Sequence, residues 1–361
     1  MKSYKNLWEE CIDYDNIIAS ITYVATHRKK KSHIKNIMTN IDEYAEIITD
    51  LMENYTPRKH KTVEICDRAS GKTRNIIVPT FEESVIHHLM IRAMTPMLTK
   101  GMSKFTFASI PGRGIHKCAK LISNWLIEDK KNTKYCLKMD IKKFFESIDH
   151  DWLKSELKDH IHDKKFLKLA FKMIDTTDIG LPLGFYTSHW FANWLLQPLD
   201  HYIKEELKAK YYVRYMDDMV IFGSNKNKLH DIRKDISRWL DHHNLKLKDN
   251  WSVFRMEYIK GDNTRKGNVL EFIGFKFHRN YRTIRKNILN RMKRKAEKIG
   301  KKGKCSPHDA HQMMSYLGWI KWSETYTVYK KYIQPHITIK KCKKIIAKYD
   351  KKMKSLKKFE V

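Results

Sequence analysis

Two adjacent aspartates stand between two β-rich runs of the 361-residue chain. Tyr211–Phe222 reads YYVRYMDDMVIF, so residues that favour strands flank Asp217 and Asp218 on both sides. A carboxylate in such apolar surroundings is costly to bury unless it is paired or binds a metal. The pattern predicts an antiparallel hairpin whose turn carries two carboxylates.

A third aspartate closes another run with strand character. Asp140 stands near the end of Tyr135–Ile141, which reads YCLKMDI. Carboxylates from neighbouring strands can converge on Mg²⁺, which prefers oxygen ligands and commonly combines one or two carboxylates with substrate phosphates. Two such ions about 3.5–4 Å apart can activate an attacking hydroxyl and stabilise a leaving pyrophosphate. The alternative is a polar turn at Asp217 and Asp218 and a helix cap at Asp140. The combination of three acids in a basic chain favours the metal site.

The rest of the chain mixes helical and strand patterns, which predicts an α+β fold. Apolar residues recur at three- and four-residue intervals in much of residues 1–60 and again over Trp152–Phe171, as in amphipathic helices. Thr62–Val78 has the pattern of a hairpin with a basic, glycine-containing tip, and Leu270–Phe277 has strand character. From about Tyr281 to its end the chain is basic and is expected to be helical.

Positive charge dominates the chain and gathers towards its C-terminal end. Lys and Arg number 72 against 41 Asp and Glu, a formal net charge of +31. The last 80 residues hold 24 Lys and Arg and five Asp and Glu. Such an excess predicts a polyanionic partner, either a nucleic acid or an anionic membrane surface. We favour nucleic acid, and no membrane, because the charge and the three carboxylates share one chain.

Cysteine usage and the N-terminus bear on the compartment. The six cysteines show no Cys-x-x-Cys spacing, which favours reduced and mostly buried thiols. No run of 18 apolar residues is present, and the N-terminal residues lack an apolar core followed by a cleavage site. A cytoplasmic location is therefore expected.

The acidic motifs resemble those of a known enzyme family. Tyr215–Asp218, with the sequence YMDD, resembles the catalytic box of reverse transcriptases, and the strand that leads to Asp140 resembles their first metal-binding motif. The resemblance runs from about Lys72 to Tyr329, and its motifs follow in the family's order. It implies an α+β right-hand polymerase with fingers, a palm with an antiparallel sheet, and a helical thumb. The implied parts are a helical N-terminal extension (1–60), fingers (61–135), a palm with a fingers-derived insertion near 150–180 (136–280), and a basic helical thumb (281–361).

The resemblance assigns the acids and one neighbour to metal binding. Asp140, Asp217 and Asp218 would be catalytic. Together with the backbone carbonyl of Ile141 they would hold two Mg²⁺ ions, for which Mn²⁺ can substitute. Asp217 is expected to be the stronger second ligand, because adjacent residues in a strand point to opposite faces.

A second group is implied to bind the incoming deoxynucleotide. Arg74 resembles the fingers arginine that grips the triphosphate, with Lys72 two residues before it. A solvated hairpin charge is the alternative for Arg74. Phe145 resembles the bulky side chain that abuts the sugar and excludes a ribose 2′-hydroxyl, while the alternative is that Phe144 and Phe145 are both core residues.

The segment Leu181–Gly184 is similar to the family's nucleotide-contacting loop, so Leu183 and Gly184 join the nucleotide-binding group. Many reverse transcriptases carry Gln at the position of Leu183. An apolar side chain cannot hydrogen-bond the nucleotide there, which should relax base-pair checking. An aliphatic residue at this position is a habit of the reverse transcriptases of diversity-generating retroelements. Ser188–His189, however, stands where that group usually has Ser-Gln, and related antiphage-defence (group II intron-like) enzymes share the layout.

Contacts with nucleic acid are implied in the later part of the chain. Ile273, Gly274 and Phe275 look like the primer grip, a hairpin that holds the primer end. The basic residues expected to contact nucleic acid are Arg113, Arg285, Lys286, Arg291, Lys293 and Arg294.

The proton donor for the departing pyrophosphate is left open. The family usually has a lysine late in the palm, but the matching position here is Trp251. Lys246 and Lys248 lie nearby and are expected to be solvated charges.

These features predict an RNA-directed DNA polymerase that extends a DNA primer with deoxynucleotides and makes cDNA on an RNA template. Low fidelity, a dedicated structured non-coding RNA, and a role in a retroelement or in antiphage defence are further expectations. An accessory protein or a homo-oligomer fits the same reading. The alternatives are a template-independent or protein-primed DNA polymerase of a defence system, and a catalytically silent RNA-binding protein.

Overall fold

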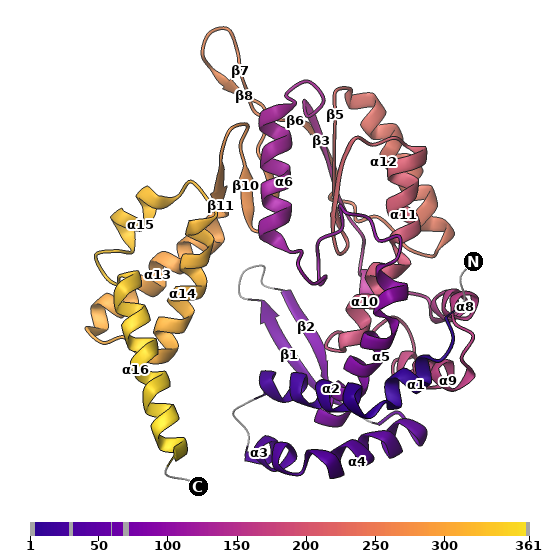
Figure 1. The fold of residues 1–361 in the computed structure, drawn as a ribbon. Coiled ribbons are helices and arrows are strands. Elements are labelled where there is room, and N and C mark those ends of the chain that lie inside the picture. Colours follow the sequence, from indigo (N-terminus) through magenta and orange to yellow (C-terminus); the bar gives the residue numbers. More distant parts are fainter. Residues whose placement is uncertain (1–3, 29–31, 59, 68–71, 359–361) are drawn as a thin grey trace. The chain divides into compact units, whose positions relative to one another are not determined.

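A computed structural model describes residues 4–28, 32–58, 60–67 and 72–358. The chain divides into two compact units, whose elements are shown in Figure 1. The first unit comprises Met1–Gly112, Leu137–Phe222 and Asn227–Val253, and the second comprises Arg113–Cys136, Gly223–Lys226 and Phe254–Val361.

The N-terminal part of the first unit is helical, as the apolar spacing predicts. Its helices are α1 (Leu7–Ile12), α2 (Tyr14–His27), α3 (Ser32–Thr39), α4 (Ile41–Glu53) and α5 (Phe81–Thr99). Helix α4 buries Ala45, Ile48 and Met52 along one stripe, which is why the segment is stable as a helix only against the rest of the unit. Helix α5 begins at a capping box in which Thr80 and Glu83 satisfy each other's backbone N–H groups.

The predicted basic hairpin is formed by strands β1 (Lys61–Asp67) and β2 (Lys72–Val78), which pair antiparallel along their whole length. Strand β2 is also fastened to a distant loop, because the N–H of Ile77 donates to the carbonyl of Leu183 at 2.8 Å. The hairpin therefore has a defined position within the first unit.

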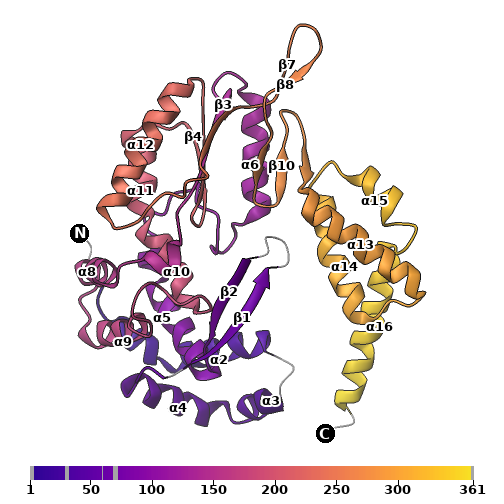
Figure 2. The ribbon, with the colours of Figure 1, turned by 180° about the vertical axis from the view of Figure 1, so that it is seen from behind.

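A four-stranded sheet has the order β4-β5-β3-β6. Its strands are β3 (Tyr135–Asp140), β4 (Tyr211–Tyr215), β5 (Asp218–Gly223) and β6 (Ser252–Arg255). Met219, Val220 and Ile221 are all buried, so β5 has both faces covered and reads as a continuous apolar run. Figure 2 shows this sheet from behind.

Helices surround the middle of the first unit. They are α7 (Phe144–Ser147), α8 (His150–His160), α9 (Lys164–Ile174), α10 (Tyr186–Leu195), α11 (Gln197–His201) and α12 (Lys226–His242), with a π-helical turn at Tyr202–Glu206. The helical spacing predicted over Trp152–Phe171 is confirmed, as two helices, α8 and α9. The chain breaks between α8 and α9, where Asp163 accepts a hydrogen bond from the N–H of Phe166 and caps a new helix.

The second unit joins a small antiparallel sheet to a helical bundle. Its elements are α6 (Ile115–Glu128), β7 (Tyr258–Ile259), β8 (Arg265–Lys266), β9 (Leu270–Phe272), β10 (Phe275–Phe277), β11 (Arg282–Ile284), α13 (Lys286–Lys302), α14 (Pro307–Lys321), α15 (Tyr326–Tyr332) and α16 (Ile339–Lys358). Strands β9, β10 and β11 pair antiparallel in the order β11-β10-β9. The segment after Tyr281 therefore begins with a strand, and the predicted basic helices start at Lys286.

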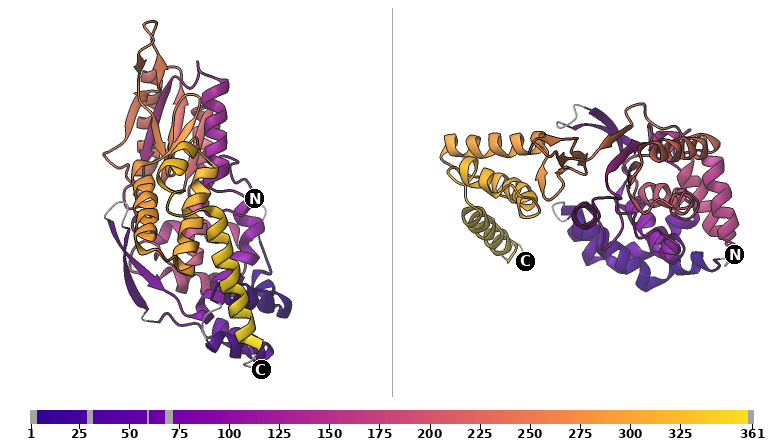
Figure 3. Two further views of the ribbon diagram at one scale, coloured as in Figure 1. Left: turned by 90° about the vertical axis from the view of Figure 1, so that its left-hand side faces the viewer. Right: turned by 90° about the horizontal axis from the view of Figure 1, so that it is seen from above.

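The bundle of the second unit is held by apolar side chains that alternate with the many lysines. Met292 and Ile299 of α13 and Leu317 of α14 are among its buried residues. Helices α14 and α16 lie side by side in both views of Figure 3. Among the helices in the described ranges, none is long and apolar enough to cross a membrane.

Candidate active site

The acidic pair stands at the corner between β4 and β5, as predicted. Tyr215 pairs with Asp218, so Met216 and Asp217 form a two-residue turn. Met216 has φ 62°, in the left-handed region that residues other than glycine seldom adopt. The strand alternation used to rank Asp217 above Asp218 does not apply to this pair, because Asp217 belongs to the turn and Asp218 begins β5. Turn geometry, and not strand alternation, therefore sets their directions.

Asp140 meets this corner from the neighbouring strand. It is the last residue of β3, and the next N–H, that of Ile141, donates to the carbonyl of Asp217 at 3.3 Å. Burial raises the pKa of Asp217 to about 7, with further contributions from the charges of Asp140 and Asp218 and from a hydrogen bond with the Asp140 carboxyl group. The structure therefore brings the three predicted acids together, and their mutual repulsion is strong enough to be felt in the pKa of Asp217.

Lys248 supplies a positive charge to the same place. Its Nζ atom contacts Oδ2 of Asp140, and its backbone N–H donates to the Asp140 carbonyl at 2.8 Å. The hydrogen bond with Asp140 raises the pKa of Lys248. Lys246 is exposed as expected, but Lys248 is not a free solvated charge. Trp251 instead packs under the guanidinium of Arg233, 4.6 Å from its ring centre.

The donor set at this corner fits a hard divalent cation. Oxygen is the only ligand type that three carboxylates offer, and Mg²⁺ prefers it. Burial, followed by the charges of Asp140 and Asp218, raises the pKa of Asp217, and a bound cation would favour the ionised carboxylate. In the part of the chain that the structure describes, no three or more His, Cys, Asp or Glu side chains are already arranged as a metal-binding group, and this includes the three aspartates of the corner. An open set of carboxylates completed by water and substrate phosphates is the usual arrangement for Mg²⁺.

The two adjacent phenylalanines after Asp140 have different environments. Phe144 is buried in the core, with 2% of its surface exposed, whereas Phe145 is partly exposed. The carbonyl of Phe145 accepts the N–H of Leu181 at 2.6 Å, and the ring of His189 lies edge-on to its ring at 5.2 Å. Only one of the two aromatics is a core residue, which leaves Phe145 accessible for the sugar-contacting role.

The Leu183–Gly184 segment lies against the strand that carries Arg74. The carbonyl of Leu183 accepts the N–H of Ile77, and Gly184 has φ 115°. A Cβ atom on Gly184 would lie 2.1 Å from the Ile77 carbonyl oxygen, so this close approach requires glycine. Arg74 is exposed on β2, three residues before Ile77. The side chain of Lys72 lies outside the described residues. The hydrogen bond from Ile77 to Leu183 thus joins the strand that carries Lys72 and Arg74 to the Leu183–Gly184 segment. The nucleotide-binding role of these four residues stays a prediction.

The predicted primer grip is the corner between β9 and β10, in the second unit. Phe272 pairs with Phe275, so Ile273 and Gly274 form a two-residue turn with φ 41° and 86°. Phe275 is fully buried, 5.0 Å from the ring of Trp319, and acts as an anchor of the turn. The turn itself is therefore what this hairpin can present to a ligand.

The predicted nucleic-acid-binding cations divide into two groups. Lys286 and Arg294 are exposed, whereas Arg285 donates to the carbonyl of Glu271 at 2.9 Å and Lys293 lies 3.7 Å from the ring centre of Tyr332. Arg113 and Arg291 are partly buried. The exposed members are the ones best placed to meet phosphates in solution.

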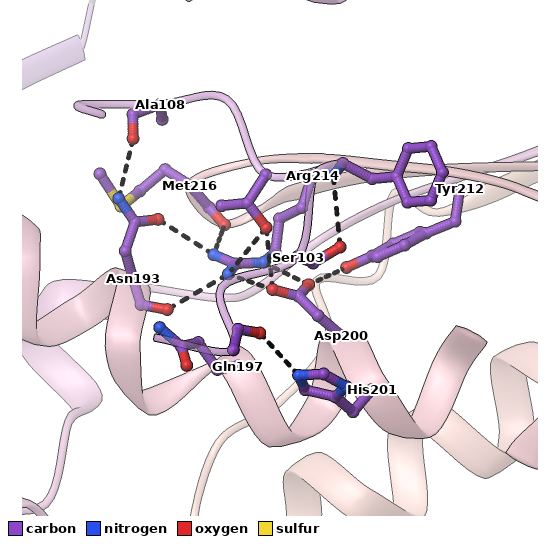
Figure 4. Close-up of polar contacts among 12 residues, drawn as sticks. Ser103, Ala108, Asn193, Gln197, Asp200, His201, Tyr212, Arg214 and Met216 are labelled. Atoms are coloured by element: carbon purple, nitrogen blue, oxygen red, sulfur yellow. Dashed lines mark hydrogen bonds and ion pairs between the residues drawn. The ribbon is translucent and has the colours of Figure 1, made fainter. Parts of the chain in front are cut away.

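Sequence reasoning missed a buried polar cluster behind the Met216–Asp217 corner, which Figure 4 shows. Arg214 and Asp200 form a fully buried ion pair, and Asn193 lies beside it. The available signal was a single arginine in the otherwise apolar strand YYVRY, since a charged residue is almost never fully buried without a partner.

Comparison with known proteins decides the family. Residues 58–320, more than half of the chain, match the family model described as reverse transcriptase (RNA-dependent DNA polymerase). The chain belongs to the reverse transcriptase family. The α+β architecture with antiparallel sheets agrees with the right-hand fold of reverse transcriptases, so the predicted fold class is confirmed.

The matches to curated relatives cover only part of each relative's length. The Retron Ec73 reverse transcriptase of Escherichia coli is 28% identical over 184 residues, 47% of this chain and 55% of that protein. Protein YkfC of Escherichia coli strain K12 is 22% identical over 166 residues, 43% of each chain. The chain thus spans about half the length of these relatives. Among solved structures, apo telomerase from Candida tropicalis matches with a TM-score of 0.45 and 14% identity, over 63% of this chain and 48% of that one.

Proposed function

We propose that the protein is an RNA-directed DNA polymerase, which adds deoxynucleotides to the 3′ end of a primer on an RNA template. One observation carries the proposal: Asp140 and the Asp217–Asp218 corner converge in a chain that belongs to the reverse transcriptase family. Holding three carboxylates together against their repulsion costs folding free energy, and a cation-dependent reaction would explain why they are kept together.

The residues of the corner divide the work. Asp140, Asp217 and Asp218, with the carbonyl of Ile141, would hold two Mg²⁺ ions, with Mn²⁺ as a substitute. Bound there, the ions would lower the pKa of the primer hydroxyl and neutralise charge on the phosphates. Asp217 has to be ionised to bind a cation, and its raised pKa makes this step favourable only above about pH 7 in the absence of metal.

We assign to Lys248 the role of stabilising the departing pyrophosphate. Trp251 carries no charge and its indole N–H is not acidic, whereas the ammonium group of Lys248 already lies at the Asp140 carboxylate. A cation at this point would neutralise the charge that develops on the leaving group. Contact with the ammonium group of Lys248 also keeps the Asp140 carboxylate in one orientation.

Substrate selection would depend on Phe145 and Leu183. The partly exposed ring of Phe145 favours deoxynucleotides, because it leaves no room for a 2′-hydroxyl. The apolar Leu183 offers no hydrogen bond to the nucleotide, which supports low fidelity. Arg74 and Lys72 on β2 would bind the triphosphate, since β2 is fastened to the Leu183–Gly184 segment.

The finer proposals concern parts and partners. We propose a helical extension (1–60), fingers (61–135), palm (136–280) and basic thumb (281–361), with the Ile273–Phe275 hairpin near the primer end. The partners would be an RNA template, a DNA primer, the cDNA product and deoxynucleotides. A relative named as a retron reverse transcriptase supports a retroelement or a defence system that employs a dedicated structured RNA. An accessory protein or a second copy of the chain would complete such a system.

Primer extension tests the proposal. Purified protein, a defined RNA template with a DNA primer, all four deoxynucleotides and Mg²⁺ should give a product whose sequence complements the RNA. Asp217→Asn should abolish extension while RNA binding persists. Products unrelated to the template would instead indicate a template-independent enzyme. Binding of RNA by the wild-type protein without any extension would indicate a silent RNA-binding protein, and either result would contradict the proposal.

A further inference from the structure

We propose that Arg214 and Asp200 are positioning residues that hold the Met216–Asp217 corner in place for cation binding. The inference rests on the proposed function, because it concerns the same carboxylates. Both side chains have 0% of their surface exposed, and Figure 4 shows Arg214 between Asp200 and the backbone of Met216. Their effect on the reaction would therefore pass through the backbone of Met216.

The guanidinium of Arg214 uses all of its five N–H donors. Nε donates to Oδ1 of Asp200 at 2.8 Å, and Nη2 donates to Oδ2 at 2.6 Å, so the pair is bidentate. The other Nη2 proton goes to the carbonyl of Asn193 at 3.2 Å. Nη1 donates to Oδ1 of Asn193 at 3.1 Å and to the carbonyl of Met216 at 3.0 Å. Through this last bond, Arg214 connects the Met216–Asp217 corner to Asn193 of α10 and Asp200 of α11.

Asp200 is equally well satisfied from the other side. Its Oδ1 also accepts the hydroxyl of Tyr212 at 2.6 Å, and its Oδ2 accepts the hydroxyl of Thr106 at 2.9 Å. Each carboxylate oxygen therefore has two donors. A buried ionic cluster with every group paired is rigid, and it fixes the direction of the one bond that leaves it for Met216.

The corner has two reasons to relax without such support. Met216 adopts φ 62°, which is strained for a residue with a side chain. The next residue, Asp217, is pressed against the like charge of Asp140, with that of Asp218 nearby. A corner free to move would let these carboxylates separate, and a divalent cation would then have to gather them again. The bond to the Met216 carbonyl opposes this movement.

A plain structural ion pair is the competing explanation. Buried pairs can often be replaced by apolar residues of similar volume without loss of stability, whereas removal of one partner leaves an uncompensated charge. The double variant Arg214→Met/Asp200→Leu therefore separates the two explanations. It removes both charges together, keeps the volume, and deletes the bond to Met216.

The measurement compares this double variant with the wild type by two readouts. One is the Mg²⁺ concentration for half-maximal primer extension, and the other is Mn²⁺ affinity measured by electron paramagnetic resonance on the protein without substrates. We expect the double variant to need about 10–100-fold more Mg²⁺ and to bind Mn²⁺ correspondingly more weakly, as is typical when the support of a metal ligand is lost. The KM for template–primer should change less than about twofold.

Tyr212→Phe is the matched control. It removes one hydrogen bond to Asp200 in the same buried cluster but leaves the bond from Arg214 to Met216 intact. It should lower the melting temperature and leave both metal readouts unchanged. If the double variant fails to fold, Arg214→Lys retains the charge opposite Asp200 without the guanidinium fork, and the same metal defect is expected.

A folded double variant, or a folded Arg214→Lys, with wild-type Mg²⁺ dependence and Mn²⁺ affinity would overturn the inference. A metal defect of equal size in Tyr212→Phe would overturn it as well, since that variant keeps the bond to Met216. Failure of the proposed function gives a different result. In that case the wild-type protein does not extend a primer, and the Mn²⁺ comparison still decides whether Arg214 and Asp200 position the corner.

Discussion

Two hairpin corners of this protein have the same length and different support. Met216–Asp217 joins β4 to β5, and Ile273–Gly274 joins β9 to β10. Both are two-residue turns; φ is positive at Met216 in the first and at both residues in the second. The first is held from behind by the Arg214–Asp200 pair. The second has no buried ion pair behind it: Gly274 lies against the ring of Trp319, and its carbonyl accepts the backbone N–H of Arg285 at 3.0 Å.

The difference follows from the charge that each corner carries. Asp217 must stay close to two other carboxylates, so the backbone before it is held by directional hydrogen bonds from a buried guanidinium. The neutral Ile273–Gly274 corner has no repulsion to resist, and apolar packing with one backbone hydrogen bond is sufficient. Four variants test this difference between the charged and the neutral corner and its consequences for the site.

The largest effect is expected from Asp140→Asn. It preserves the shape of the side chain and removes a charge from the carboxylate corner, so the rate of primer extension should fall by about 10³-fold or more, equivalent to about 4 kcal/mol of transition-state stabilisation. Steady-state extension measures the rate, and filter binding measures RNA affinity. A variant that retains a tenth of wild-type activity would show that Asp140 is not a metal ligand.

Gly274→Ala should damage the apolar corner. A Cβ atom there would lie 2.5 Å from the Trp319 ring, and φ is 86°, so the free energy of unfolding should fall by about 2–3 kcal/mol. Urea denaturation measures the change. Gly303→Ala is the matched control, because Gly303 has φ 61° but no heavy atom within 4 Å of the added Cβ. It should cost only about 1 kcal/mol. Equal losses in both variants would show that the contact with Trp319 contributes nothing.

Asp217→Asn should stabilise the metal-free protein in a pH-dependent way. The pKa of Asp217 is raised from 3.8 to about 7, so between these values the folded state binds more protons than the unfolded state and stability falls as pH rises. Asn carries no such penalty. The melting temperature of the variant should exceed that of the wild type by about 2–4 °C at pH 8, or about 1–2 kcal/mol, and by nothing at pH 4.

Addition of Mg²⁺ sharpens the same experiment. It should raise the melting temperature of the wild type more than that of Asp217→Asn, because the cation stabilises the ionised carboxylates. If the melting temperature of Asp217→Asn without metal exceeded that of the wild type by the same amount at pH 4 and at pH 8, charge at the corner would not be the cause of the stabilisation.

The smallest effect is expected from Leu183→Gln, which adds a polar group at the uncharged edge of the site. One new hydrogen bond to a correctly paired nucleotide corresponds to about 0.5–1.5 kcal/mol, so misincorporation should fall by about 2–10-fold. Sequencing of cDNA made on a defined RNA measures the error rate. Leu183→Met is the control that stays apolar. The same error rate in both variants would show that the polarity of residue 183 does not affect fidelity.

The sequence predicted those parts of the site that local patterns encode. The two β-rich runs around Asp217 and Asp218 specify a hairpin, and the run before Asp140 specifies a strand, because propensity and alternation act over a few residues. The C-terminal helices from Lys286 onward follow in the same way from apolar residues spaced among lysines. Family resemblance then indicated that Asp140 would meet the other two acids.

Contacts between distant segments could not be predicted. Lys248 is 108 residues from Asp140, and Arg214 reaches Asn193 and Asp200 on other elements. Nothing in the spacing of Lys246 and Lys248 tells which one faces the site. Helical spacing alone does not locate the break between α8 and α9, since apolar spacing continues across it and the cap at Asp163 marks the new helix.

The central claim is that Asp140, Asp217 and Asp218 jointly hold two divalent cations. The most direct test is the number of Mn²⁺ ions bound per chain, measured by electron paramagnetic resonance with an RNA template, a chain-terminated DNA primer and the matching deoxynucleotide. The account predicts two protein-dependent Mn²⁺ ions in the wild type and at most one in Asp140→Asn. The same number of ions in both proteins would contradict it.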